Sequence, residues 1–432
     1  MLNATKLWTG AATAGDALRY GQVPGKGGNG AVLGARTTTV SEAPKSARAR
    51  RPVVFWNITR RCNLRCVHCY ANAMDKDFPG ELTTAEGLRL LDDLAAFGVP
   101  AVILTGGEPL CRPDIFELAA HAHDLGLRLT LSTNGTLIDF AMAERIHAVG
   151  FAYVGISFDG MGEDHDKFRR MPGAFQKSLE AVRYLAAVGQ PVGLRLTLTR
   201  RNYEALPRMF ELIEKEGIRR ACFYHLVHVG RGEALRPDTL THEETRRAVD
   251  MILDAAADFQ SRQVPCEILT VDCPTDGVYL YTKLRRRDPV RAKAVRAMLE
   301  WNGGGTNGSG VGCGCVDWSG NVHPDQFWHH YTLGNVRERP FSEIWQDTSD
   351  PLMGGLKNRV PLLKGRCRSC QYLALCGGGF RVRAERAHGN PWMADPACYL
   401  TDKEIGLVSN GEVMAETTAG SPPGRTTGGG LG

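Results

Sequence analysis

The stretch that decides the fold is Cys62-Asn63-Leu64-Arg65-Cys66-Val67-His68-Cys69, in which three cysteines are spaced C-x3-C-x2-C. It follows the short apolar run Val53-Val54-Phe55-Trp56, which predicts a first β-strand. Three thiolates in one tight loop can ligate three irons of a 4Fe-4S cube and leave the fourth iron open, whereas a structural zinc site uses four protein ligands. The stretch therefore predicts a catalytic metal cluster at the end of a strand.

The sequence outward from this loop alternates short apolar runs with amphipathic stretches. Thr83 and Glu86 form a capping-box pattern before the next apolar run, which predicts a helix there, and a further helix should start near Thr241. Six βα units fit a partial (β/α)6 barrel better than a complete barrel of about 250 residues, with the active site at the carboxyl ends of the strands. The predicted parallel strands are 53–56, 101–104, 127–131, 153–156, 192–198 and 221–226.

Polar groups follow several of these strands. After the second strand comes Thr105-Gly106-Gly107-Glu108-Pro109, where the glycines allow backbone to approach a ligand and Glu108 offers an acceptor to an ammonium group. Later strands end in Ser132-Thr133-Asn134-Gly135 and Ser157-Phe158-Asp159-Gly160. These groups are expected to converge on one mouth of the barrel.

The cysteine spacing and the Gly-Gly-Glu stretch together resemble the radical S-adenosylmethionine (SAM) superfamily. The resemblance implies that SAM chelates the open iron and that its reductive cleavage yields a 5′-deoxyadenosyl radical. It implies catalytic and metal-binding roles for Cys62, Cys66 and Cys69. It further implies SAM contacts from His68, Gly106, Gly107, Glu108, Ser132, Asn134, Ser157, Asp159 and Arg195. For Arg169 and Arg195 a carboxylate partner and a surface ion pair are both open, because a guanidinium suits either.

A second cysteine set has the spacing C-x2-C-x5-C-x21-C and consists of Cys367, Cys370, Cys376 and Cys398. Spacing alone permits zinc, but the set resembles the SPASM extension of radical SAM enzymes, which implies an auxiliary 4Fe-4S cluster. Asp325 and Phe380 stand where a full extension carries further cysteines. We therefore expect SAM and two 4Fe-4S clusters, one catalytic and one auxiliary. Cys313 and Cys315 could form a partial metal site or be packed or free thiols. The other four cysteines are expected to pack as small hydrophobic side chains, namely Cys111, Cys222, Cys266 and Cys273.

The expected organisation follows the change in pattern along the chain. Residues 1–50 and 407–432 are rich in Gly, Thr and other small residues and are predicted to be disordered. Residues 51–265 form the partial barrel, 266–302 a linker or helical segment, and 303–406 a small cysteine-rich SPASM-like domain.

Composition restricts the partners. The 432 residues carry a formal net charge of +5, with 43% hydrophobic and 23% charged residues, and no apolar run is long enough to span a membrane. This balance disfavours nucleic-acid binding and membrane insertion. The N-terminus shows no secretory signal pattern, so a cytoplasmic location is the expectation, and thirteen cysteines then indicate metal binding over disulfides.

The C-terminal third narrows the resemblance to members that modify tetrapyrroles. The stretches 320–328, 334–341 and 395–401, together with 52–57 and 272–280, resemble the NirJ group of heme d1 biosynthesis. This implies action on 12,18-didecarboxysiroheme with removal of propionate side chains, a ferredoxin or flavodoxin as electron donor, and contacts with other tetrapyrrole-pathway proteins. Related heme-pathway enzymes remove acetates or decarboxylate propionates instead. A peptide maturase and a zinc-stabilised binding protein are the remaining alternatives.

Candidate substrate contacts follow from the carboxylates and the iron of such a substrate. Arginines suit the carboxylates and histidines suit the iron. The candidates are Arg195, Arg200, Arg201, Arg285, Arg286, Arg287, His323, His329 and His330.

Overall fold

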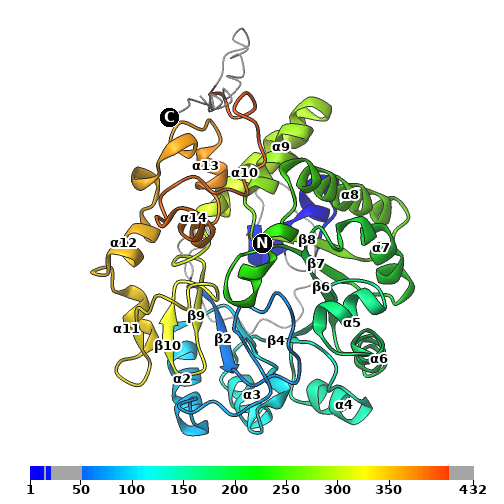
Figure 1. The fold of residues 1–432 in the computed structure, drawn as a ribbon, viewed down its shortest axis with the longest axis vertical. Helices are drawn as coiled ribbons and strands as arrows, with labels where there is room; N and C mark the ends of the chain where they lie inside the picture. The colour runs from blue at the N-terminus through cyan, green and yellow to red at the C-terminus, as the bar shows by residue number, and fades with distance from the viewer. Residues whose placement is uncertain (14–15, 21–50, 408–432) are drawn as a thin grey trace, which may run out of the picture.

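The computed structural model describes residues 1–13, 16–20 and 51–407. Within these residues, strands form one curved sheet in the order β1-β8-β7-β6-β5-β4-β3-β2-β9-β10-β11 (Figure 1). Strands β2 to β8 run parallel to their neighbours and β9 is parallel to β2, whereas β1, β10 and β11 pair antiparallel. The strands are β1 Leu2–Asn3, β2 Val53–Thr59, β3 Val102–Gly106, β4 Leu129–Thr133, β5 Tyr153–Ser157, β6 Val192–Leu198, β7 Arg220–His225, β8 Glu267–Val271, β9 Cys313–Val316, β10 Asn321–His323 and β11 Gly334–Asn335.

Helices follow the parallel strands and lie around the outside of the sheet (Figure 1). Parallel strands require such crossovers, and the alternation produces an open α/β barrel. The α-helices are α1 Asp16–Tyr20, α2 Thr84–Phe97, α3 Ile115–Asp124, α4 Phe140–Ala148, α5 Glu163–Arg169, α6 Ala174–Ala187, α7 Leu206–Lys215, α8 His242–Ser261, α9 Thr275–Arg287, α10 Pro289–Trp301, α11 Phe341–Gln346, α12 Pro351–Lys357, α13 Leu373–Cys376 and α14 Arg381–His388. A π-helical turn, η1, spans Thr5–Thr9.

The six predicted strands are all present as β2 to β7. The predicted capping box of α2 is formed, since the Thr83 side chain accepts from the Glu86 backbone and the Glu86 side chain accepts from Thr83 in return. Helix α8 begins in the same way with Thr241 and Glu244. The partial α/β barrel with a small C-terminal domain is therefore confirmed.

The sheet is larger than predicted. Residues 266–302 were expected to be a linker or helical segment, but they contain β8 as well as α9 and α10. At the opposite end of the parallel strands, β9 pairs with β2, with Cys315 in register with Phe55. Strand β9 has only four residues, two of them cysteines, so its apolar signal is weak. Strand β8 is as long as β3, but Glu267 and Thr270 interrupt its apolar run.

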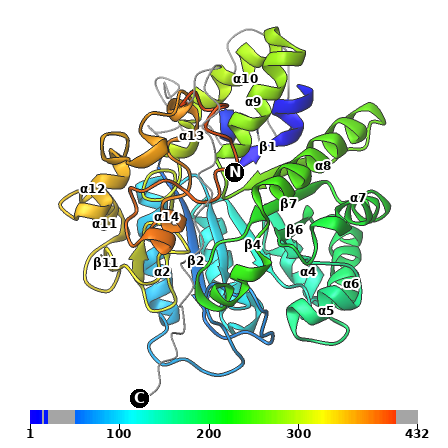
Figure 2. The ribbon, with the colours of Figure 1, turned by 45° about the horizontal axis from the view of Figure 1, so that its top comes forward.

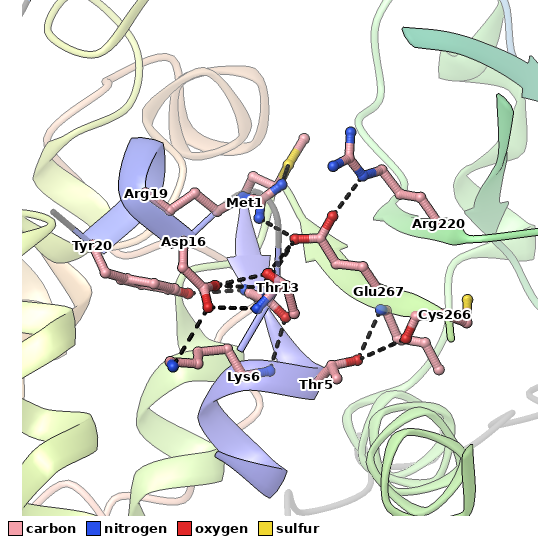
Figure 3. Close-up of polar contacts among 12 residues, drawn as sticks. Met1, Thr5, Lys6, Thr13, Asp16, Arg19, Tyr20, Arg220, Cys266 and Glu267 are labelled. Carbon is pink, nitrogen blue, oxygen red and sulfur yellow. Dashed lines mark hydrogen bonds and ion pairs between the residues drawn. The ribbon is translucent and has the colours of Figure 1, made fainter. Parts of the chain in front are cut away.

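The prediction of a disordered N-terminus is wrong for residues 1–13 and 16–20, because they pack on the edge of β8. Leu2 and Asn3 pair with Thr270 and Leu269, and η1 packs against α8. The Glu267 carboxylate is the centre of this contact: it accepts from Asn3 at 3.0 Å, and from Thr13, and it forms ion pairs with Arg19 and Arg220 (Figure 3). These partners are distant in sequence, so composition could not predict them. The disorder predicted for 21–50 and 408–432 concerns residues outside the described ranges.

The two faces of the sheet differ in character. On the outer face Trp56 of β2 is fully buried against α2, where Gly87 leaves room: a Cβ there would lie 2.9 Å from the indole ring. The inner face carries Phe55, Arg195 and Tyr224, which line a cavity. Burial of apolar side chains on the outer face stabilises the barrel, while the polar inner face is available for function.

The C-terminal elements lie beside β2 and α2 (Figure 2). The Leu82 backbone donates to Trp318 O at 2.7 Å, and Arg337 forms an ion pair with Glu86 at 2.7 Å. Ser342 at the start of α11 donates to Asp93 of α2. These contacts fix the C-terminal region on the barrel side that carries the cysteine loop. No described helix is both long and apolar enough to cross a bilayer.

Candidate active site

The loop after β2 places Cys62, Cys66 and Cys69 along one cavity at the carboxyl ends of the strands. Cys62 and Cys66 are buried and Cys69 is half-buried. The cavity has an empty volume of about 1110 Å³, its open mouth included. It lies where α/β barrels carry their active sites.

Each sulfur of this loop accepts an N–H donor. Such donors stabilise the thiolate form, and a bound metal displaces the thiol protons. Burial raises the pKa of the Cys62 and Cys66 thiols, so these thiols stay protonated until a metal binds. The three sulfurs and their donors therefore fit an iron-sulfur cluster with three protein ligands. The contacts are Leu64 N to Cys62 Sγ at 3.4 Å, Arg169 Nη1 to Cys66 Sγ at 3.5 Å and Ala73 N to Cys69 Sγ at 3.4 Å.

The glycine pair at the end of β3 packs tightly on the start of the cysteine loop. A Cβ on Gly106, whose φ is +121°, would lie 2.4 Å from Thr59 O, and one on Gly107 would lie 2.1 Å from Arg61 O. The Gly107 amide donates to Thr59 O at 2.7 Å. Both glycines line the cavity, so they join the cysteine loop to the next strand as well as lining the site.

Glu108 does not line the cavity, although the sequence predicted it as a cofactor contact. Its carboxylate is fully buried and accepts from the Thr133 hydroxyl and the Asn134 amide, each at 2.8 Å, and from the Leu110 amide at 3.2 Å. Burial raises the pKa of this carboxyl. Glu108 thus positions the end of β4 and lies behind the residues that line the cavity.

Ser132, Asn134 and Ser157 line the cavity as predicted positions at strand ends. The Asn134 side chain donates to Asn63 Oδ1 at 2.9 Å, which connects the end of β4 to the cysteine loop. The Ser132 hydroxyl accepts from Arg195, which also lines the cavity.

Asp159 forms a buried ion pair with Arg169, which in turn donates to Cys66. Although burial opposes its ionisation, the pKa of Asp159 is lowered by Arg169 and by His68, whose Nε2 is 3.7 Å away. Arg169 therefore does not form a surface ion pair, because its carboxylate partner is the buried Asp159. Through this ion pair, the segment that follows β5 contacts Cys66 of the cysteine loop.

His68 is neutral at physiological pH, because burial lowers its pKa to about 4. Its ring lies 4.8 Å from the ring of Phe168. Its Nδ1 is buried and has no hydrogen-bond partner among the described residues. This nitrogen can therefore serve a ligand.

Several cavity residues were not predicted. Tyr224 and His225 stand at the end of β7, where the strand-end rule applied elsewhere would have found them. Asp272 follows β8 with a φ of +66°, and it was missed together with that strand. Arg231 holds the cysteine loop by donating to Cys66 O and Ala73 O, each at 2.8 Å; these carbonyl contacts leave no sequence signal.

The second cysteine set is brought together around a small pocket of about 390 Å³ empty volume. All four residues line it, and the Tyr372 amide donates to Cys370 Sγ at 3.4 Å. Burial raises the pKa of the Cys367, Cys370 and Cys376 thiols. Four sulfurs around a pocket with an apolar lining fit a closed metal site, for a cluster or for zinc. None of the thirteen cysteines, all within the described ranges, forms a disulfide.

Asp325 and Phe380 stand where a full SPASM extension carries cysteines, and both make packing or hydrogen-bond contacts with their neighbours. Asp325 is buried and accepts from the Ser309 hydroxyl and the Phe327 amide, and burial raises its pKa to about 7. Phe380 packs edge-on against Phe327 at 5.7 Å. Cys315 accepts from the Asn57 side chain at 3.5 Å. Among the remaining cysteines, Cys222, Cys266 and Cys273 are buried and Cys111 is half-buried.

Most other candidate substrate contacts lie away from the cavity. Arg200 and Arg201 pair with Glu244 and Asp238, and Arg285, Arg286 and Arg287 are exposed in the last turn of α9. His330 pairs with Glu385 and His323 with Asp317. His329 stacks on Tyr70 at 5.8 Å, and burial lowers its pKa to about 3. None of these residues is among those that line the described cavity.

Comparison with known proteins agrees with this geometry. Residues 56–213 match the radical SAM superfamily, and residues 310–371 match SPASM, an iron-sulfur cluster-binding domain. The chain is 50% identical over 409 residues to Fe-coproporphyrin III synthase of Methanosarcina barkeri, covering 94% of this chain and 99% of that protein. It is 45% identical over 370 residues to pre-heme d1 synthase of Dinoroseobacter shibae, covering 85% of this chain and 91% of that protein.

The fold is similar to that of solved structures with lower sequence identity. SuiB of Streptococcus suis, bound to S-adenosylmethionine, superposes with a TM-score of 0.64 at 19% identity, covering 81% of this chain and 77% of that chain. At this identity the likeness concerns the architecture alone.

Proposed function

The chain belongs to the radical SAM superfamily, in the branch of tetrapyrrole-modifying enzymes with a SPASM domain, and from this premise we propose that it removes carboxylate-bearing side chains from 12,18-didecarboxysiroheme. The observation that carries the substrate class is the near full-length similarity to two relatives that are both named for iron tetrapyrroles. The cavity beside the cysteine loop also carries the guanidinium of Arg195, which is a suitable partner for a substrate carboxylate.

Two products compete within this proposal. Removal of acetates would give iron-coproporphyrin III, and the 50% identity over 94% of the chain favours it. Removal of propionates would give the heme d1 precursor, which the stretches at 320–328 and 395–401 and the 45% identical relative favour. We place the acetate reaction first, since its relative matches more of the chain with more identical residues, and so revise the order that the sequence motifs suggested.

We assign the catalytic cluster to Cys62, Cys66 and Cys69. SAM is assigned to polar groups that face the same cavity, and Glu108 is a positioning residue behind them. The proposed SAM contacts are His68, Gly106, Gly107, Asn134, Ser157 and Asp159, whereas the Ser132 hydroxyl is engaged by Arg195.

When bound, the cluster and SAM supply hydrogen-atom abstraction from a C–H bond of the substrate. The protein's part is positioning. Arg231 donates to the backbone carbonyl of Cys66, and Arg169 donates to the sulfur of the same residue. The Tyr70 hydroxyl, which follows the loop, donates to Asn57 Oδ1 of β2 at 3.0 Å. His68 contributes an uncharged ring, so it does not repel a cationic cofactor.

We assign one auxiliary cluster to Cys367, Cys370, Cys376 and Cys398, because Asp325 and Phe380 are committed to other contacts. After hydrogen abstraction, homolytic loss of an acetate side chain would release it as a radical, which needs one electron and one proton to become acetate. An auxiliary cluster would be suited to relay that electron from an external donor. A ferredoxin or flavodoxin is the proposed electron donor, with tetrapyrrole-pathway proteins as further partners. The peptide-maturase alternative has less support, since both relatives reported above carry tetrapyrrole names.

The test is an anaerobic turnover assay. The reconstituted enzyme is mixed with SAM, dithionite and 12,18-didecarboxysiroheme, and 5′-deoxyadenosine and tetrapyrrole mass are followed. We expect 5′-deoxyadenosine together with loss of acetate-sized fragments; propionate-sized losses would instead establish the heme d1 reaction. An unchanged tetrapyrrole alongside steady SAM cleavage would refute the substrate assignment.

A further inference from the structure

Arg195 differs from the other arginines of the cavity in its partners. Its guanidinium donates to the Ser132 hydroxyl and lies 4.9 Å from the centre of the Tyr224 ring. Arg169 has the Asp159 carboxylate, and Arg231 has two backbone carbonyls. Within the described ranges, no carboxylate lies within ion-pair distance of Arg195, although Asp272 lines the same cavity.

The inner face of the sheet is shaped around this side chain. A Cβ on Gly155 of β5 would lie 2.7 Å from Arg195 Cδ, so a larger residue there would block the path of Arg195 toward β4. On β6, a Cβ on Gly193 would lie 2.3 Å from the Tyr153 hydroxyl, so this glycine makes room for the aromatic ring beside it. Two glycines in neighbouring strands weaken a sheet unless the space is needed. Here the space holds a cation and an aromatic ring.

Arg195 lies deeper in the barrel than Asp159 and Asn134, which follow the ends of their strands. It stands at mid-strand in β6, in register with Ser157 and Cys222, whereas Asp159 lies beyond the end of β5 and accepts from the Thr197 amide at 2.9 Å. Asn134 likewise lies beyond the end of β4 and contacts the cysteine loop. The groups that meet the cysteine loop are thus at the rim, and Arg195 projects from the wall below it.

A half-buried guanidinium with a hydroxyl and a ring as partners retains N–H donors that face the cavity. Desolvating a cation without an opposite charge is costly, and a carboxylate matches the guanidinium fork with two parallel hydrogen bonds. The site therefore suits a carboxylate that enters with a ligand.

We propose that Arg195, together with Ser132 and Tyr224, binds a side-chain carboxylate of the tetrapyrrole substrate and so determines which side chain faces the cysteine loop. This inference rests on the proposed function. The sequence suggested two roles for Arg195, a SAM contact and a contact with substrate carboxylates, and this inference selects the second. The carboxylate of SAM is the competing source of the same chemistry, and the experiment separates the two.

The experiment measures binding to the full-length reconstituted enzyme. The probes are 12,18-didecarboxysiroheme, its carboxyl methyl ester and SAM, each titrated anaerobically against the unaltered enzyme, Arg195→Gln and Arg195→Lys. Arg183→Gln is the matched control, because Arg183 is an exposed arginine paired with Glu216. Uncoupled formation of 5′-deoxyadenosine reports the integrity of the cysteine loop in every variant.

Arg195→Gln should raise the dissociation constant of the tetrapyrrole roughly 10-fold to 100-fold, the range for a lost charge-assisted hydrogen bond. Its affinity for SAM should change less than about twofold, as for a residue that makes no contact with SAM. Esterification should weaken binding to the unaltered enzyme and have little further effect on Arg195→Gln. Arg195→Lys keeps the charge but lacks the guanidinium fork, so its dissociation constant for the tetrapyrrole should lie between those of the unaltered enzyme and Arg195→Gln. Arg183→Gln should bind the tetrapyrrole as the unaltered enzyme does.

Weakened SAM binding with unchanged tetrapyrrole binding in Arg195→Gln would overturn the inference and assign the arginine to SAM. Equal sensitivity of the unaltered enzyme and Arg195→Gln to esterification would also overturn it. Failure of the unaltered enzyme to bind either tetrapyrrole is a different result, because it contradicts the proposed function itself. If Arg195→Gln does not fold, the Arg195→Lys measurement decides between the same outcomes.

Discussion

The two cysteine sets of this molecule sit in contrasting surroundings. The three cysteines after β2 lie in a loop on a cavity of about 1110 Å³ whose lining includes the charged side chains of Asp159, Arg169 and Arg195. The four C-terminal cysteines surround a pocket of about 390 Å³ that is lined mainly by cysteines, glycines and apolar side chains. Three thiolates leave a coordination position for a ligand, and four close the site. We infer that the first site is the reactive one and that the second serves electron transfer or stability.

The largest effect is expected at the open site. Cys66→Ala removes one of three proposed cluster ligands together with the sulfur that Arg169 contacts. We predict that 5′-deoxyadenosine formation falls below detection and that about four irons are lost per chain. Chromatography of the reaction and iron analysis measure this. Cys111→Ala is the control, as Cys111 lines neither site, and continued SAM cleavage by Cys66→Ala would contradict the assignment.

The closed site should behave differently. Cys398→Ala should also lose about four irons, but it should retain SAM cleavage with dithionite, because the loop after β2 is untouched. Tetrapyrrole conversion should fall severely. Iron analysis, 5′-deoxyadenosine and tetrapyrrole mass from one preparation provide the readout. Full iron content in Cys398→Ala, or bound zinc in the unaltered protein, would remove the auxiliary cluster from the account.

A subtler change tests how the open site is positioned. Glu108→Gln places an amide where a buried carboxylate accepts from Thr133, Asn134 and Leu110. Since hydrogen bonds to a buried charged group contribute about 1.5–3 kcal/mol, we expect SAM affinity to fall roughly 10-fold or more, with iron content preserved. Isothermal titration with SAM measures this. Unaltered affinity would mean that the end of β4 does not need this carboxylate.

The smallest effect on chemistry is expected from a change remote from both sites. Glu267 lies at the start of β8, where, against the effect of burial, Arg19 and Arg220 lower its pKa. Glu267→Gln should lower the free energy of unfolding by about 2 kcal/mol at pH 7 and leave both iron sites intact. Because the folded pKa is depressed, this contribution exists above the unfolded value of about 4.3 and is lost as the pH falls through the folded value.

Denaturant titrations of Glu267→Gln and the unaltered protein at pH 7 and near pH 4 test this sign. The difference in unfolding free energy should shrink toward acid. A difference that grows toward acid, or loss of iron in Glu267→Gln at pH 7, would show that the N-terminal contact has another role.

Predictions from the sequence succeeded where the interacting residues are close together in the chain and failed where they are far apart. The strands β2 to β7, the capping boxes at Thr83 and Thr241 and both cysteine sets depend on residues close in sequence, so their spacing was informative. The pairing of Leu2 with Thr270 and the contacts of Glu267 join distant residues, and composition misjudged them. Glu108 was assigned a ligand role because its partners at the end of β4 cannot be read from its own motif.

The most direct measurement uses 12,18-didecarboxysiroheme deuterated both at the saturated ring carbons next to its acetates and in its propionate side chains. If the cavity beside Cys62, Cys66 and Cys69 brings one of these C–H bonds to the reacting centre, deuterium should appear in 5′-deoxyadenosine as the tetrapyrrole loses the neighbouring side chain. Conversion of the tetrapyrrole with no deuterium in 5′-deoxyadenosine would contradict the account.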